Sequence, residues 1–175
     1  RRGLPNIRSM IEAVETLTTD KAVKLFEKFG IFTKAELESR EEVLYEIYAK
    51  TINIEALTMI DMASKEIIPA VIKYSKSLAD SVLAVKEAGA DAEVQTELLK
   101  EVSAKLTEMK TALAKLEEVE AKAAAMENAK DQAFYYKDVV KAAMDELRKP
   151  ADELEMIVDK KVWPFPTYAD LMFEV

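Results

Sequence analysis

The feature that most constrains the fold of this chain is how rarely its sequence is interrupted. Three glycines and five prolines in 175 residues leave long stretches without the residues that end helices or form tight turns. Alanine, leucine, glutamate, lysine and methionine fill those stretches, and all of them are strong helix formers. The sequence therefore predicts an all-α fold made of a few long helices.

The N-terminal part contains recognisable starts and ends of helices. After an irregular entry at Leu4–Pro5, the apolar spacing predicts a clear helix over residues 20–28. Gly30 supplies the left-handed residue that ends this helix. Thr33 and Glu36 have the Thr-x-x-Glu spacing of a capping box, which predicts that the next helix begins here.

That next helix is predicted to run from Lys34 through the eighties, where Gly89 ends it. We expect Pro69 to bend this helix without ending it, because the apolar spacing resumes at Val71 and Ile72. Its expected core positions are the following apolar residues: Leu37, Leu44, Ile47, Tyr48, Ile52, Ile54, Leu57, Met59, Ile60 and Met62.

A heptad pattern follows Gly89 and predicts a helical hairpin. The apolar residues alternate by threes and fours, as in a coiled coil: Leu99, Val102, Leu106, Met109, Leu113, Leu116 and Ala123. The simplest use of that seam is an antiparallel hairpin with the preceding helix. A turn is expected around residues 127–132, then a helix over 133–147 and a last helix that begins at Pro150.

The chain closes on an aromatic segment, Trp163–Tyr168, which we call the strap. Pro164 and Pro166 remove two backbone donors and favour extended backbone at the residues before them, so we expect the tail to be irregular. Docking of the strap on the protein is the favoured interpretation, and a proline-rich ligand for a peptide groove is the alternative. The predicted fold is an elongated all-α helical bundle with a long antiparallel hairpin and an irregular Pro/aromatic C-terminal tail.

Composition excludes several classes of function. The chain contains no cysteine and no histidine, which excludes disulfides, thiolate metal sites and Ser-His or Cys-His nucleophiles. A net charge of −8 argues against nucleic acid and anionic membranes as partners. Without an apolar run of membrane-spanning length or a visible signal peptide, the expected location is cytoplasmic. Because the sequence opens on Arg1 without an initiator methionine, we expect a piece of a longer protein.

The densest motif of mixed polarity is Lys50–Met62, where Asn53, Glu55, Thr58 and Asp61 lie within an apolar helix. It is interpreted either as a ligand or carboxylate site or, preferably, as a buried network that fixes helix register, with Lys50 or another cation as partner. Tyr135–Tyr136 is interpreted as helix packing in preference to a binding patch. These residues alone identify no catalytic, cofactor-binding or metal-binding residue.

Three blocks of the sequence together resemble the C-terminal region of the type III glutamine synthetases. They occur in the order of that family and cover nearly the whole chain apart from the generic heptad segment. The first comprises Lys24–Thr33 and Glu36–Arg40, the second is Lys50–Met62, and the third runs from Tyr135–Val140 through Ala151–Glu155 to Trp163–Phe173.

The resemblance implies a parent enzyme that joins ammonia to glutamate with ATP and divalent Mg or Mn, and a catalytic domain upstream in the same chain. It implies that residues 1–32 form the helical end of the catalytic domain and residues 33–175 a C-terminal helical extension. This part would itself be non-catalytic and would support homo-oligomer assembly, with the hairpin projecting from a body built on Leu25, Leu57 and Trp163. The alternative is a free-standing acidic helical-bundle adaptor that binds another protein.

Overall fold

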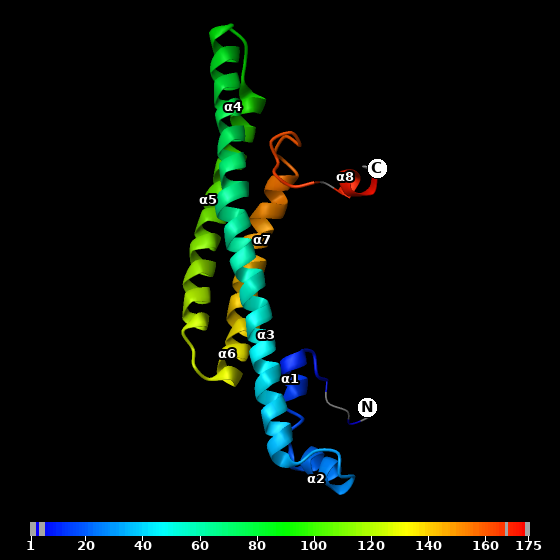
Figure 1. Ribbon diagram of the computed structural model, residues 1–175. Coiled ribbons are helices and arrows are strands. Elements are labelled where there is room, and N and C mark those ends of the chain that lie inside the picture. The colour runs from blue at the N-terminus through cyan, green and yellow to red at the C-terminus, as the bar shows by residue number, and fades with distance from the viewer. Residues whose placement is uncertain (1–2, 4–5, 167, 174–175) are drawn as a thin grey trace. The chain divides into compact units, whose positions relative to one another are not determined.

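The computed structural model describes residue 3, residues 6–166 and residues 168–173, and every regular element in those ranges is helical (Figure 1). The predicted all-α fold is therefore confirmed. The chain forms two compact units: unit 1 comprises residues 1–55 and 120–141, and unit 2 comprises residues 56–119 and 142–175. The irregular entry expected at Leu4–Pro5 lies outside the described residues, as does Thr167 of the strap.

Unit 1 is built from short N-terminal helices that pack on one end of a long helix. Its elements are α1 (Met10–Val14), α2 (Asp20–Lys28), the first part of α3 (Lys34–Met62), the end of α5 (Glu93–Ala124), α6 (Ala129–Tyr135) and the π-helical segment η2 (Tyr136–Val140). A buried cluster joins α1, α3 and α6 and consists of Ile11, Val14, Tyr45 and Ala133. The rings of Tyr45 and Phe134 pack beside it with centroids 6.2 Å apart.

The helix boundaries predicted for the N-terminal part are confirmed. Helix α2 covers Asp20–Lys28, and Gly30 after it has φ of 64°, the left-handed conformation that glycine adopts without strain. In the capping box, the Thr33 N–H donates to a Glu36 carboxylate oxygen at 2.7 Å. The Glu36 N–H donates back to the Thr33 hydroxyl at 3.4 Å.

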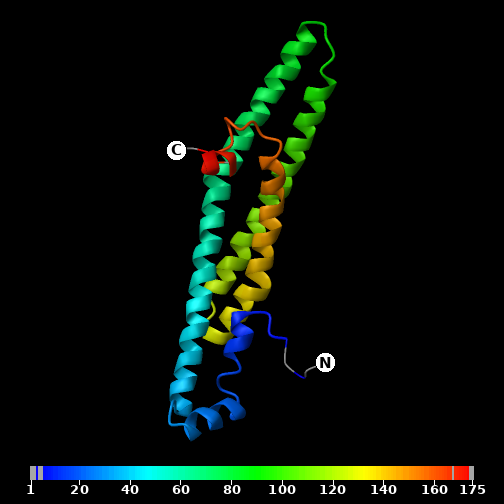
Figure 2. The same cartoon turned by 90° about the vertical axis from the view of Figure 1, so that its right-hand side faces the viewer.

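Unit 2 contains the predicted helical hairpin. Its elements are the end of α3, the π-helical segment η1 (Ala63–Ile67), α4 (Ile68–Glu87), most of α5, α7 (Lys141–Glu155) and α8 (Tyr168–Phe173). Helices α4 and α5 run side by side in opposite directions (Figures 1 and 2). The heptad prediction is confirmed at five positions of α5, which are fully buried and of which the last lies in unit 1: Val102, Met109, Leu113, Leu116 and Ala123.

The helix continues past Pro69, as predicted, through the π-helical segment η1. In a regular α-helix the ring of Pro69 would clash with the carbonyl of Lys65, and that carbonyl would lose its donor. The chain widens into η1 just before the proline, where the Ile68 N–H donates to the Ala63 carbonyl, five residues back. A π-helical turn thus accommodates the proline, and the bend expected there stays a prediction.

Several expected core positions on α3 are wrong. Ile47, Ile54 and Leu57 are exposed, whereas the expected Leu37 and Ile52 are buried. The inward side of α3 carries Tyr45, Ala49, Ile52 and Ala56, and Ala63 at the start of η1 continues it. These residues recur at helical spacings of three, four and seven, so they form one continuous seam. Small alanines let neighbouring helices approach closely, whereas sequence reasoning favoured the larger side chains on the opposite face.

Two further expectations about the C-terminal part need correction. Pro150 does not begin a helix but lies inside α7, where it is buried on the same apolar face as Leu147 and Leu154. The tail is irregular from Trp163 to Pro166, as predicted, but then returns to helix in α8. A proline restricts the backbone of the residue before it, not of the residues after it, so the turn after Pro166 is free to be helical.

Candidate functional site

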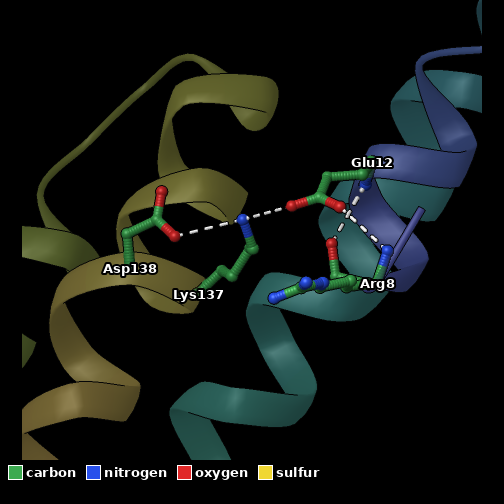
Figure 3. Close-up of polar contacts among 5 residues, drawn as sticks. Arg8, Glu12, Lys137 and Asp138 are labelled. Atoms are coloured by element: carbon green, nitrogen blue, oxygen red, sulfur yellow. Dashed lines mark hydrogen bonds and ion pairs between the residues drawn. The ribbon is translucent and has the colours of Figure 1, made fainter. Parts of the chain in front are cut away.

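An ion pair in unit 1 anchors the N-terminal helix (Figure 3). The Lys137 ammonium, on η2, donates to a Glu12 carboxylate oxygen at 2.7 Å and lies 3.2 Å from Asp138. The other Glu12 oxygen accepts the Arg8 N–H at 3.1 Å, and the Ser9 hydroxyl accepts the Glu12 N–H at 3.3 Å. The site therefore joins the start of α1 to a segment that is 125 residues away in the sequence.

The electrostatics of this pair suit an anchor better than an acid–base catalyst. The hydrogen bond from Lys137 holds the pKa of Glu12 below its ordinary value. The same bond raises the pKa of Lys137. Both groups are thus held in their charged forms, whereas a general acid or base needs a pKa close to the working pH.

A second ion pair attaches α6 to the N-terminal part: Lys130 lies 2.7 Å from a Glu15 carboxylate oxygen. Within α3, the Tyr45 hydroxyl donates to Glu41 at 3.1 Å. Burial, reinforced by that hydrogen bond, raises the pKa of Tyr45 well above its ordinary range, so this phenol stays protonated. The Glu12–Lys137 and Glu15–Lys130 pairs thus hold sequence-distant parts of unit 1 together.

The structure does not bring the polar residues of Lys50–Met62 together. The Lys50 ammonium pairs with Glu46 at 2.7 Å on the surface of α3, and Asp61 pairs with Lys65 one turn along the same helix. Glu55 is exposed, whereas the side-chain oxygen of Asn53 is buried and the Asn53 side chain lies beside the Tyr136 hydroxyl. The motif is therefore neither a carboxylate site nor a buried network with Lys50 as its cation.

For Tyr135–Tyr136, the structure supports the preferred interpretation of helix packing, through the burial of Tyr136. Tyr136 is 1% exposed and lies in η2 beside the buried Val140. Its buried hydroxyl lies beside the Asn53 side chain without a well-formed hydrogen bond, and burial raises the pKa of this group. Tyr136 thus contributes apolar packing and brings its hydroxyl to Asn53 in the core of unit 1.

In unit 2 the strap docks on the protein, which confirms the favoured interpretation for its described part. Trp163, the only tryptophan in the sequence, is 9% exposed, and its ring meets Phe165 edge-on with centroids 6.3 Å apart. Asp159 forms the turn into the strap: its carboxylate accepts the Lys161 N–H, and its carbonyl accepts the Trp163 N–H. Lys160 forms an ion pair with Asp170 of α8.

The docked strap closes one side of a cavity of about 300 Å³, which we call the strap cavity. Met59, Met62 and Met109 contribute to its wall, and Trp163 and Phe165 line it from the strap. Arg148 and Asp152 also line the cavity, and the Arg148 Nε lies 3.2 Å from the Asp152 carboxylate. The indole N–H of Trp163 is buried, and no described residue accepts a hydrogen bond from it. Sequence reasoning missed this cavity, because no motif marks it and only the path of the strap creates it.

Ion pairs attach the hairpin to α7. Lys105 on α5 lies 2.7 Å from Glu153 on α7 and 3.0 Å from Glu108 on its own helix. The hydrogen bonds to both carboxylates raise the pKa of Lys105. Lys115 and Glu146 form a second bridge between the same helices. The hairpin is therefore attached to α7 by charged contacts as well as by its buried seam.

Across residues 6–166 and 168–173, no three acidic side chains converge in a way that would hold a metal ion. Within the same part of the chain, no helix is both long and apolar enough to cross a membrane.

Comparison with known proteins identifies the family. The family model for the glutamine synthetase C-terminal domain matches residues 1–86. Along its whole length the chain is 38% identical to a glutamine synthetase of Butyrivibrio fibrisolvens. It is 33% identical over 98% of its length to the type-3 glutamine synthetase of Dictyostelium discoideum. The chain belongs to the C-terminal region of the type III glutamine synthetases.

The match defines how much of such an enzyme this region represents. A glutamine synthetase of Bacteroides fragilis is 31% identical over 99% of the chain, which spans 25% of that relative. The region also spans 25% and 24% of the relatives from Butyrivibrio and Dictyostelium, so it is part of a larger chain. The resemblance inferred from the three sequence blocks is confirmed, and the match includes the heptad segment that those blocks left out.

Proposed function

We propose that this region is the non-catalytic C-terminal helical part of an enzyme that joins ammonia to glutamate with ATP. The observation that carries the proposal is the match of the whole chain to a quarter of the length of glutamine synthetases. On this proposal, ATP and Mg²⁺ or Mn²⁺ bind to residues elsewhere in the enzyme, and the enzyme is cytoplasmic. The division of the region at residue 33, into the end of the catalytic domain and an extension, stays a prediction.

We propose that unit 1 contacts the catalytic domain through an apolar patch on and after α2. The patch, named here the α2 patch, consists of Leu25, Phe29 and Ile31, which are all exposed. Next to these residues in the sequence, the Phe26 and Phe32 rings pack with centroids 5.6 Å apart, which joins α2 to the segment after it. An ordered helix end that exposes three large apolar side chains is typical of a surface that another part of the protein covers.

We propose that the hairpin of unit 2 contacts a second copy of the subunit. Leu83 on α4 and Val94 on α5 are exposed apolar side chains near the turn that joins the two arms. The buried seam and the Lys105–Glu153 ion pair attach the α5 arm to α7. The hairpin is therefore held in place and can present these side chains to another subunit. This supports a role in homo-oligomer assembly.

The expectation that the hairpin projects from a body built on Leu25, Leu57 and Trp163 is wrong for the two leucines, because both are exposed, whereas Trp163 is buried.

The α2 patch is tested by Phe29→Glu in the complete synthetase that contains this region. Because Phe29 is 65% exposed here, the substitution should leave the melting temperature of the 175-residue chain unchanged. In the complete enzyme it should reduce the yield of folded, active subunit, because a charge would be buried against the catalytic domain. Lys24→Glu on the same helix is the matched control. Equal yields for the two variants would refute the contact.

The hairpin contact is tested by Leu83→Glu in the same enzyme, with Lys86→Glu as the control on the same helix. Light scattering should report a smaller assembly for Leu83→Glu and the parental mass for Lys86→Glu. An unchanged mass for Leu83→Glu would place subunit contacts elsewhere.

The assignment of catalysis to the rest of the enzyme is tested by replacing the metal ligands upstream of this region while the region itself stays intact. Glutamine formation should then be lost.

A further inference from the structure

We propose that a groove in unit 1 binds a segment of the catalytic domain of the same subunit, and that this segment carries an acidic side chain among apolar ones. The groove, named here the α3 groove, lies along the first turns of α3, and all of its lining residues belong to unit 1. The inference rests on the proposed contact between unit 1 and the catalytic domain, and it adds the chemistry of the segment that makes the contact. Its apolar wall includes Leu17, Val43 and Leu44, and its polar lining is Glu36, Ser39 and Arg40.

The wall of the groove favours apolar side chains in the partner. Its volume of about 650 Å³ lies within the range of protein clefts that bind a ligand. Val43 in the wall is 50% exposed, and Ile47, one turn further along α3, is 51% exposed. Residues four positions apart lie on the same face of a helix, so the two side chains form one apolar strip. An apolar strip that runs into a groove is typical of a surface that a partner covers.

A stack of side chains holds a cation at the edge of this groove. The Arg40 guanidinium carbon lies 4.3 Å from the centroid of the Phe32 ring. That ring packs in turn on Phe26, with ring centroids 5.6 Å apart. A guanidinium held over an aromatic face is attracted by the ring and keeps its N–H donors available to a further partner. Arg40 is therefore in place before a partner binds, which lowers the entropy that binding costs.

The charge of Arg40 specifies the polar part of the partner. No carboxylate among the described residues lies within ion-pair distance of Arg40, whereas Arg148 lies 3.2 Å from Asp152. Glu36, one turn before Arg40, is engaged in the capping box, where it accepts the Thr33 N–H at 2.7 Å and the Thr33 hydroxyl at 2.8 Å. A guanidinium binds a carboxylate through two parallel hydrogen bonds. An Asp or Glu side chain of the partner would thus complement Arg40.

The position of the groove indicates the source of this segment. Ile31 of the α2 patch and Glu36 of the groove both line a further cavity, so the patch and the groove adjoin. A partner that covers the α2 patch is therefore placed to fill the groove as well. The region spans 25% of the Butyrivibrio and Bacteroides relatives, so most of such a subunit lies outside it and can supply the segment.

The test uses the complete synthetase with the photo-cross-linking residue benzoylphenylalanine at one position at a time. In Val43→benzoylphenylalanine, light should join the groove to a peptide of the catalytic domain that contains Asp or Glu. The product should keep the mass of one subunit in a denaturing gel. Glu42→benzoylphenylalanine is the matched control, because Glu42 lines a different cavity, and it should give no such link. A product with the mass of two subunits, a link only to peptides without an acidic residue, or no link to the catalytic domain would overturn the proposal.

Phe29→benzoylphenylalanine separates this inference from the proposed contact of the α2 patch. A link from position 29 to the catalytic domain without one from position 43 would refute the role of the groove and leave that of the patch. The absence of a link from either position would refute both.

Arg40→Glu, combined with the cross-linker at position 43, tests the charge. The yield of the cross-link should fall by about five-fold or more, because the acidic segment would then meet a like charge. Lys34→Glu makes the same change of charge on the same helix outside the groove and should leave the yield unchanged. Replacing the acidic residue of the linked peptide by lysine should restore the yield for Arg40→Glu. Equal yields for Arg40→Glu and Lys34→Glu would contradict the role of the guanidinium.

Discussion

Replacing Leu113 by alanine tests whether the heptad seam of α5 holds unit 2 together. Leu113 is fully buried in that seam. The substitution removes about three buried carbon groups, each worth about 0.8 kcal/mol, and leaves a cavity that adds to the loss. The expected loss in the free energy of unfolding is therefore about 3 kcal/mol. For a chain of this size, that lowers the melting temperature by about 6–12 °C.

The assay is thermal and urea unfolding followed by the fluorescence of Trp163, which belongs to unit 2 and is the only tryptophan. The signal therefore reports the unit in which the substitution is made. Leu83→Ala on the other arm of the hairpin is the matched control, because Leu83 is 62% exposed. It should cost less than about 0.5 kcal/mol. Similar losses for Leu113→Ala and Leu83→Ala would refute the assignment of the buried seam.

Two further predictions concern the polar groups of unit 1. Tyr136→Phe removes a buried hydroxyl that lies beside the Asn53 side chain without a well-formed hydrogen bond, so it should leave the stability of unit 1 within about 1 kcal/mol of the parent in urea unfolding. A clearly larger loss would mean that the hydroxyl and Asn53 form a strong hydrogen bond in solution. Because Lys137 lowers the pKa of Glu12 below its ordinary value of 4.5, this contact stabilises the fold above that pH and is lost as the pH falls through the lowered pKa. Glu12→Gln should therefore weaken the acid dependence of unfolding, followed on the amide NMR signals of α1, and Glu27→Gln should leave it unchanged.

The parts of the fold that were predictable depend on local chemistry. The limits of α2, the left-handed Gly30 and the capping box of Thr33 and Glu36 each involve residues only a few positions apart. Their hydrogen bonds form between neighbours in sequence, so the signal is present in the sequence itself. The heptad of α5 was equally predictable, because one helix face repeats over many turns.

The misassigned positions depend on neighbours that are distant in sequence. On α3, Ala49 and Ala56 are buried while Ile47 and Ile54 are exposed, because the packing helices need close approach more than apolar volume. Hydrophobicity alone cannot choose between two apolar faces of one helix. Pro150 was expected to begin a helix, but packing of the apolar face around it keeps α7 continuous through the proline.

The sequence by itself determined the helical class, the helix ends that carry caps, the heptad seam and, through three blocks of residues, the synthetase family. The tertiary structure alone decided which face of α3 is buried, that Glu12 meets Lys137, and that the strap lines an open cavity. The physical reason is the range of the interactions. Caps and periodicity act within a few turns of helix, whereas ion pairs, close helix packing and cavities depend on segments that meet only when the chain has folded.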